Sequence, residues 1–160
     1  MTGDAQPVPE DYGTVTPSLT VDGCAEALAF YEEALGAEVL FRSEGPGGKV
    51  WHAEIRVGDS RVMLNDEFPE HGSSAPTTLG GSAVSLWTYV EDVDAAFRRM
   101  VEAGAEGEME PEDMFWGDRM ASAVDPWGHR WSLATHLEDV SPGELERRQQ
   151  AALEEWGGGG

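Results

Sequence analysis

The sequence predicts an α+β fold made of two β-α-β-β-β modules, residues 14–66 and 84–137, joined by a linker over residues 67–83. The motif LGAE at 35–38 is matched by AGAE at 103–106, about 68 residues later. Each motif ends a helical pattern that follows a strand and precedes a closing hairpin. One half is small for a stable core, so we expect the two modules to pair.

Apolar periodicity places the elements of the first module. Residues 15–21 (VTPSLTV) alternate apolar and polar side chains, which is typical of a strand with one buried face. Residues 24–35 have helical apolar spacing, with Asp22 or Gly23 as the cap and Gly36 at the end. Further strands are expected over residues 39–42, 50–57 and 61–65.

The second module repeats the order. A strand over 84–90 leads to a helix that Asp92 caps and Gly104 ends. Asp-Pro-Trp-Gly at 125–128 is a turn signal between two short apolar runs, and so predicts a hairpin.

Neither end of the chain is expected to belong to the modules. Residues 1–13 are polar and contain proline, which predicts a disordered tail. Residues 138–160 are expected to form a C-terminal helix, opened by a capping box at Ser141, and a glycine tail.

The chain is strongly acidic. Ten Lys and Arg against 31 Asp and Glu give a net charge of −21 and a pI of about 4.2. This field repels nucleic acid and anionic membranes and would favour a cationic ligand, although solubility or a salty cytoplasm is the preferred explanation of the acidity. The single cysteine, Cys24, forms no intramolecular disulfide. No apolar run is long enough to span a bilayer and no signal pattern opens the chain, so a cytoplasmic protein is expected.

Several longer motifs are spread over residues 14–142. They are VTPSLTVDG, AFYEEALGAE, HAEIRVGD, MLNDE, VSLWTYVEDVD, EDMFWGDR and DPWGHRWSLATH. Together they resemble the PhnB-like branch of the vicinal oxygen chelate superfamily, which has the glyoxalase and bleomycin-resistance fold. The resemblance implies that the paired modules curl into an eight-stranded mixed sheet around a cavity, with the helices outside. It also implies a homodimer.

The same resemblance divides the strand residues between two faces. Those expected to meet the helices are Ala53, Ile55, Val57, Leu86, Val90 and Leu133. Those expected to face the cavity are His52, Glu54, Arg56, Ser85, Trp87, Tyr89, Ser132, Ala134 and His136.

Metal-dependent members of the superfamily carry four ligands on four strands. The matching positions here are Thr16, Glu54, Ser85 and Ser132. Only Glu54 is a good ligand for a transition metal, because hydroxyls bind such ions weakly. We therefore expect no resident metal. The alternative is a divalent transition metal at a displaced site formed by Glu54 with the imidazoles of His52 and His136, which lie on the same predicted face.

Several candidate residues have two interpretations. His52 and Glu54 share one strand face, so they could act as general acid and base or form an ion pair with Arg56 or Arg61. Trp87 could stack on a flat ligand or fill the core.

The segment FWGDR at 115–119 also allows alternatives. Its two aromatics could form a mobile flap beside Gly117 or a plug between the modules. Asp118 and Arg119 could form an ion pair, or Arg119 could bind a carboxylate or phosphate.

The leading hypothesis is a metal-free small-molecule-binding protein of the glyoxalase and bleomycin-resistance type that sequesters an aromatic or cationic compound. The expected ligand-binding residues are His52, Glu54, Trp87, Tyr89, Trp116, Arg119, Ser132 and His136. The alternative is a metal-dependent lyase, isomerase or dioxygenase that uses His52 and Glu54. A third hypothesis is a scaffold whose C-terminal helix docks on a partner.

Overall fold

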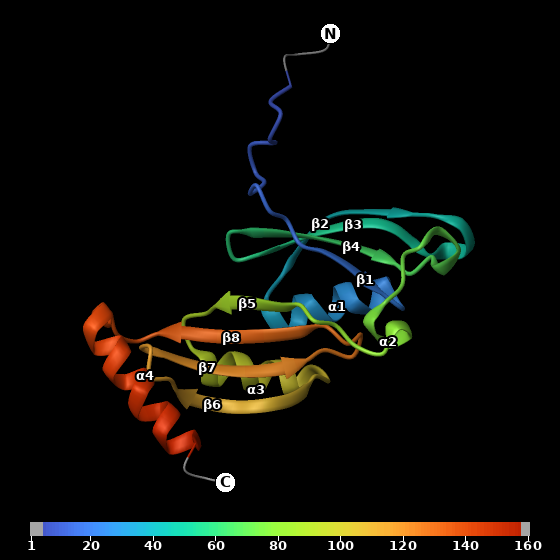
Figure 1. The fold of residues 1–160 in the computed structure, drawn as a ribbon. Coiled ribbons are helices and arrows are strands. Elements are labelled where there is room, and N and C mark those ends of the chain that lie inside the picture. Colours follow the sequence, from blue (N-terminus) through green and yellow to red (C-terminus); the bar gives the residue numbers. More distant parts are fainter. Residues whose placement is uncertain (1–4, 158–160) are drawn as a thin grey trace. The chain divides into compact units, whose positions relative to one another are not determined.

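The computed structural model describes residues 5–157 and divides into two compact units (Figure 1). The first unit contains the residues up to 83 together with 126–129, and the second contains the remainder. Residues 1–4 of the expected tail and 158–160 of the glycine tail lie outside the described residues.

The first unit has the predicted β-α-β-β-β order. Its elements are β1 (Ser18–Val21), α1 (Cys24–Leu35), β2 (Glu38–Glu44), β3 (Val50–Val57) and β4 (Ser60–Asp66). They form a four-stranded sheet in the order β1-β4-β3-β2, in which only the β1–β4 pair is parallel. The turns and the linker add three short helices: η1 (Pro46–Gly48), η2 (Pro69–His71) and α2 (Pro76–Leu79).

The second unit repeats this topology. Its elements are β5 (Ser85–Tyr89), α3 (Val93–Ala103), β6 (Glu106–Asp113), β7 (Asp118–Val124), β8 (Arg130–His136) and α4 (Pro142–Gly157). The sheet order is β5-β8-β7-β6, and β5 pairs with β8 in parallel. The predicted α+β class and the internal duplication are thus confirmed as two four-stranded mixed sheets, neither of which closes on itself.

Alternate strand residues form the core of each unit. In the first, Ala53 and Ile55 of β3 are fully buried, as is Tyr31 of α1. In the second, Leu133 of β8 and Met100 of α3 are fully buried. Val57, Leu86 and Val90, which were expected to meet the helices, are only partly buried.

A buried carboxylate organises the start of α1. Asp66, the last residue of β4, accepts hydrogen bonds from the backbone N–H groups of Gly23 at 2.9 Å, Cys24 at 2.8 Å and Val50 at 2.7 Å. Gly23 lies at the N-cap with φ of 103° and supplies no side-chain cap. Gly23 is therefore the N-cap residue, as one of the two expected alternatives has it, while the side chain that accepts from the helix start comes from a distant strand. Burial raises the pKa of the neighbouring Cys24 thiol to about 12, so Cys24 is a core residue.

Three boundaries differ from the predictions. Strand β1 begins at Ser18 instead of residue 15, directly after a proline that has no N–H to donate. The linker holds η2 and α2, and the carboxylate of Glu67 accepts a hydrogen bond from the N–H of Ala75 at 2.9 Å. In the expected tail, Tyr12 lies against the first sheet and makes the contacts described below.

The C-terminal helix α4 forms as expected, and an ion pair holds it to the residues that follow β8. Arg148 of α4 donates two hydrogen bonds to the Glu138 carboxylate, both of 2.9 Å. No residue of α4 is buried, and Leu153 and Trp156 are exposed. None of the helices within residues 5–157 combines the length and the apolar character needed to cross a bilayer.

Candidate functional site

A first polar group, here called the Glu54 cluster, consists of Tyr12, His52, Glu54 and Arg61. Glu54 lies on β3 with 15% of its side chain exposed. One of its oxygens, Oε1, lies 3.1 Å from His52 Nε2. The other, Oε2, accepts hydrogen bonds from Arg61 Nη1 at 2.8 Å and from the Tyr12 hydroxyl.

The contact between Tyr12 and Glu54 joins the N-terminal segment to the sheet. The Tyr12 ring also lies over the Arg61 guanidinium, 4.6 Å from the ring centroid to Cζ, and Asp11 forms a 3.2 Å ion pair with Arg61. The hydrogen bond from Tyr12 is the largest cause of a lowered pKa at Glu54, and it raises the pKa of Tyr12. Tyr12 was missed by sequence reasoning because a single aromatic residue in a polar segment has no periodicity.

Of the two arginines expected to pair with Glu54, Arg61 does so, whereas Arg56 contacts Glu38 of β2. Arg56 and Arg61 are directly opposite each other on β3 and β4. Like charges directly opposite each other repel, and the carboxylates of Glu38 and Glu54 offset the repulsion between these two guanidinium groups.

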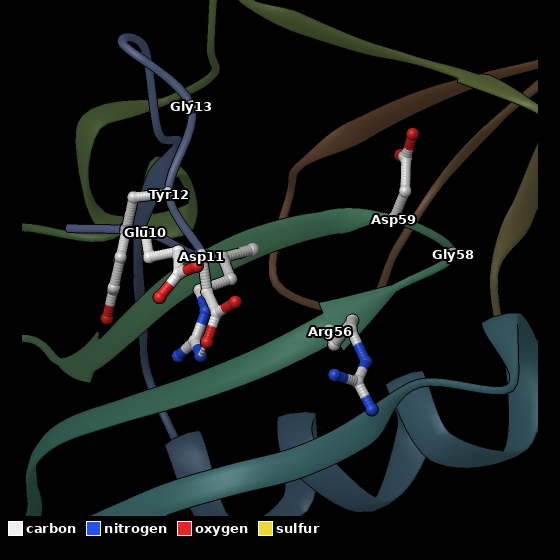
Figure 2. A pocket seen from close by; sticks show the side chains of 8 residues that line it. Glu10, Asp11, Tyr12, Gly13, Arg56, Gly58 and Asp59 are labelled. Atoms are coloured by element: carbon white, nitrogen blue, oxygen red, sulfur yellow. Dashed lines mark hydrogen bonds and ion pairs between the residues drawn. The ribbon is translucent and has the colours of Figure 1, made fainter. Parts of the chain in front are cut away.

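An open hollow of about 600 Å³ lies beside this cluster (Figure 2). Its lining residues are Glu10, Asp11, Tyr12, Gly13, Arg56, Gly58, Asp59 and Arg61. None of the eight residues expected to bind ligand is among them. The hollow lies between the N-terminal segment and the β3–β4 turn, and Figure 2 shows Tyr12 and Asp11 on one side of it and Asp59 on the other.

A second group, here called the aromatic face, consists of Trp87, Tyr89, Trp116, Asp118 and His136. Asp118 Oδ2 accepts hydrogen bonds from the Tyr89 hydroxyl at 3.1 Å and from Trp116 Nε1 at 3.2 Å. Its Oδ1 lies 2.7 Å from His136 Nδ1. The Trp87 and Tyr89 rings have centroids 6.3 Å apart, and both residues are exposed. Three of the eight expected residues, Tyr89, Trp116 and His136, therefore bond to one buried carboxylate, and a fourth, Trp87, lies beside Tyr89.

The turn before β7 positions Trp116 and Asp118. The Gly117 N–H donates to the Met114 carbonyl at 3.1 Å, and the Gly117 carbonyl accepts from the N–H groups of Leu137 at 2.9 Å and Glu138 at 3.0 Å. Gly117 has φ of 100°, and a Cβ there would lie 2.3 Å from the Glu138 carbonyl oxygen. The glycine thus allows a left-handed turn and a close backbone approach.

Arg119 lies apart from the aromatic face. It donates to Asp94 of α3 at 2.7 and 2.9 Å and to Asp113 at 2.9 Å. The expected pairing of Arg119 with Asp118 is wrong, because neighbouring strand residues point to opposite sides of a sheet. Asp118 lies directly opposite His136 in the β7–β8 register, which places these two side chains on the same face of the sheet.

Ser132 is buried and its hydroxyl lies 2.7 Å from the Ser85 hydroxyl. The Thr16 hydroxyl donates to the Gly13 carbonyl, and both oxygens of Glu54 are bonded to donors, one of them a guanidinium. Within residues 5–157 there is no group of three His, Cys, Asp or Glu side chains that could hold a metal. The four positions implied by the resemblance therefore do not fit a divalent ion.

His136 is held between two carboxylates. Its Nε2 lies 2.9 Å from Asp139, and the hydrogen bond with Asp118 is the largest cause that raises the pKa of His136 above 6.5. We therefore expect Asp118→Asn to lower the pKa of His136, as measured by NMR titration of its ring protons. An unchanged value in the variant would contradict this geometry.

The raised pKa of His136 determines how its contribution to folding stability changes with pH. Because the pKa of His136 is raised in the folded protein, its contacts stabilise the protein fully below the unfolded value of about 6.5. That contribution is lost as the pH rises through the folded pKa. The difference in melting temperature between wild type and His136→Gln should accordingly shrink above that pH.

Comparisons with known proteins agree with this architecture. A family model described as the Glyoxalase/Bleomycin resistance protein/Dioxygenase superfamily matches residues 13–133. The uncharacterized protein Mb0911c of Mycobacterium bovis is 42% identical over 148 residues, which cover 91% of this chain and 95% of that protein.

Two solved structures have the same fold. TioX from Micromonospora sp. ML1 matches with a TM-score of 0.61 and 22% identity, over 81% of this chain and 100% of TioX. The PhnB protein from Bacillus cereus matches with a TM-score of 0.60 and 20% identity, over 77% of this chain and 99% of that chain. With the family model covering most of its length, the chain belongs to the glyoxalase, bleomycin resistance protein and dioxygenase superfamily.

Proposed function

We propose that the protein binds a planar, cationic small molecule on its aromatic face, without a metal, and sequesters it. The observation that carries this proposal is the exposure of two neighbouring aromatic side chains, Trp87 at 46% and Tyr89 at 63%, of which Tyr89 donates to the Asp118 carboxylate. Large aromatics on a strand are usually covered, and an exposed pair next to a charge is typical of a binding surface.

The charges of this face favour a cation. Asp118 and Asp139 contribute two negative charges, and a protonated His136 offsets only one of them. A positively charged ring can stack on Trp87 and Tyr89, which adds a cation–π attraction to the area that it buries. The net charge of −21 raises the encounter rate with such a ligand at low salt.

A titration with planar cations, proflavine among them, tests the proposal. Quenching of tryptophan fluorescence should be saturable, and Trp87→Leu should weaken binding about 5- to 30-fold, which corresponds to about 1–2 kcal/mol for one stacked aromatic ring. The matched control is Trp156→Leu, since Trp156 is 84% exposed on α4 and lies outside the aromatic face. No saturable quenching with any cation, or equal losses in the two variants, would contradict the proposal.

Two finer assignments accompany this function. We place the protein in the PhnB-like branch, supported by the motifs at EDMFWGDR and DPWGHRWSLATH and by the fold shared with the Bacillus cereus PhnB protein. A cytoplasmic setting is supported by the single buried thiol of Cys24.

A further inference from the structure

The contacts of Tyr12 are those of a bound ligand. Its hydroxyl donates to the Glu54 carboxylate and its ring lies 4.6 Å from the Arg61 guanidinium carbon. The other Glu54 oxygen is held by His52 at 3.1 Å. A carboxylate acceptor for an O–H group and a flat cation over a ring together recognise a hydroxylated aromatic ring.

We propose that Glu54, Arg61 and His52 form a binding site for phenolic small molecules, and that Tyr12 occupies this site from within the chain. All of these residues belong to the first unit. The proposal therefore does not depend on cation binding by the aromatic face of the second unit.

The segment around Tyr12 is lightly held. Glu10, Asp11 and Gly13 are exposed, and the 3.2 Å ion pair of Asp11 with Arg61 lies at the surface, where such pairs contribute little. Within the segment, the Tyr12 N–H donates to the Pro9 carbonyl at 3.1 Å, which forms a turn but pairs with no strand. The Tyr12 side chain is thus the main attachment and can be displaced without unfolding a sheet.

A competing molecule has a route to the site. Tyr12 and Arg61 both line the open hollow of about 600 Å³ beside the β3–β4 turn (Figure 2). This volume exceeds what one substituted phenol needs, so a ligand can approach while Tyr12 leaves.

The chemistry of the cluster selects a phenol over other aromatic compounds. The Tyr12 hydrogen bond lowers the pKa of Glu54, which is therefore an anion at neutral pH and needs a donor. An anionic ligand would be repelled by Glu54 and Asp11, and an aromatic hydrocarbon has no O–H to donate. A phenol, with a pKa near 10, stays neutral at pH 7 and keeps its donor.

Occupation by Tyr12 sets the apparent affinity. A residue tethered by a short flexible segment competes at an effective concentration of roughly millimolar. The apparent Kd is the intrinsic Kd divided by the fraction of molecules with the site open, so a site that is open in about one tenth of molecules loses about 10-fold in affinity. Removal of the Tyr12 side chain should restore this lost affinity, about 10-fold.

The experiment is a titration of the full chain with 4-methylphenol, followed by two-dimensional amide NMR. Tyr12→Ala should bind about 10-fold more tightly than wild type, and its largest shifts should fall at Glu54 and Arg61. Adding Glu54→Gln to this variant should weaken binding about 5-fold or more, because the charge-assisted hydrogen bond is lost. Equal affinities of wild type and Tyr12→Ala would overturn the proposal, as would an absence of binding to Tyr12→Ala.

Two controls distinguish specific recognition of a phenol from a general effect of altering the N-terminal segment. Gln6→Ala alters an exposed position of the same N-terminal segment but leaves Tyr12 and Asp11 in place, so its affinity for 4-methylphenol should stay within about 2-fold of wild type. Toluene lacks the hydroxyl and should bind Tyr12→Ala far more weakly than 4-methylphenol; equal binding would overturn the assignment to phenols. Should Tyr12→Ala fail to fold, Tyr12→Phe replaces it, with an affinity expected between wild type and an open site, and an affinity equal to wild type would overturn the proposal.

Discussion

Asp66→Ala is expected to lower the free energy of unfolding by about 3 kcal/mol or more, since each buried N–H left without a partner costs about 1–3 kcal/mol. Asp66 is only 6% exposed and holds three backbone N–H groups. Two of these open α1 and the third begins β3, so one side chain joins a helix start to the centre of the sheet. Urea unfolding followed by circular dichroism measures the change.

The controls for this prediction isolate the carboxylate. Asp22→Ala removes an exposed carboxylate next to the same helix start and should change stability by less than about 0.5 kcal/mol. Asp66→Asn keeps one acceptor oxygen and should give an intermediate loss. A loss below about 1 kcal/mol for Asp66→Ala would show that other groups or water satisfy the three donors.

Gly117→Ala is expected to destabilise the second unit by about 3 kcal/mol or more, because backbone strain and a steric clash act together. The added Cβ would lie 2.3 Å from the Glu138 carbonyl oxygen and 3.0 Å from Val140 Cγ2. Relief requires movement of the turn that places Trp116 and Asp118. The variant should therefore also lose affinity for planar cations.

The matched control is Gly58→Ala. Gly58 has φ of 58° and no atom within 4 Å of an added Cβ, so this substitution carries the backbone strain without the clash. Its expected cost is about 1–2 kcal/mol. Thermal unfolding of both variants compares the two effects, and equal costs would contradict the close packing of the 115–118 turn against residues 138–140.

The fold could be predicted because each unit repeats local signals. Helices α1 and α3 have apolar spacing and terminal glycines, and both were expected at nearly the bounds observed. Strand β6 (EGEMEPED) was harder to recognise, because five of its eight residues are acidic and Pro111 interrupts it. It lies at the edge of its sheet, where charges and proline are tolerated.

The candidate sites were only partly predictable because they depend on contacts between distant residues. Alternation placed His52 with Glu54, and Trp87 with Tyr89, on shared faces. Nothing in the local pattern indicates that Tyr12 reaches across 42 positions to Glu54, or that Asp66 lies at the start of α1. A polar side chain that satisfies a remote donor has no period, so only the folded chain reveals it.

The indole N–H spectrum tests the binding account most directly, since each of the six tryptophans of the chain carries one indole N–H. Addition of proflavine should shift the signals of Trp87 and of Trp116, whose Nε1 donates to Asp118, and should leave Trp156 unchanged. A spectrum that does not change at saturating ligand, or a shift confined to Trp156, would contradict ligand binding on the aromatic face.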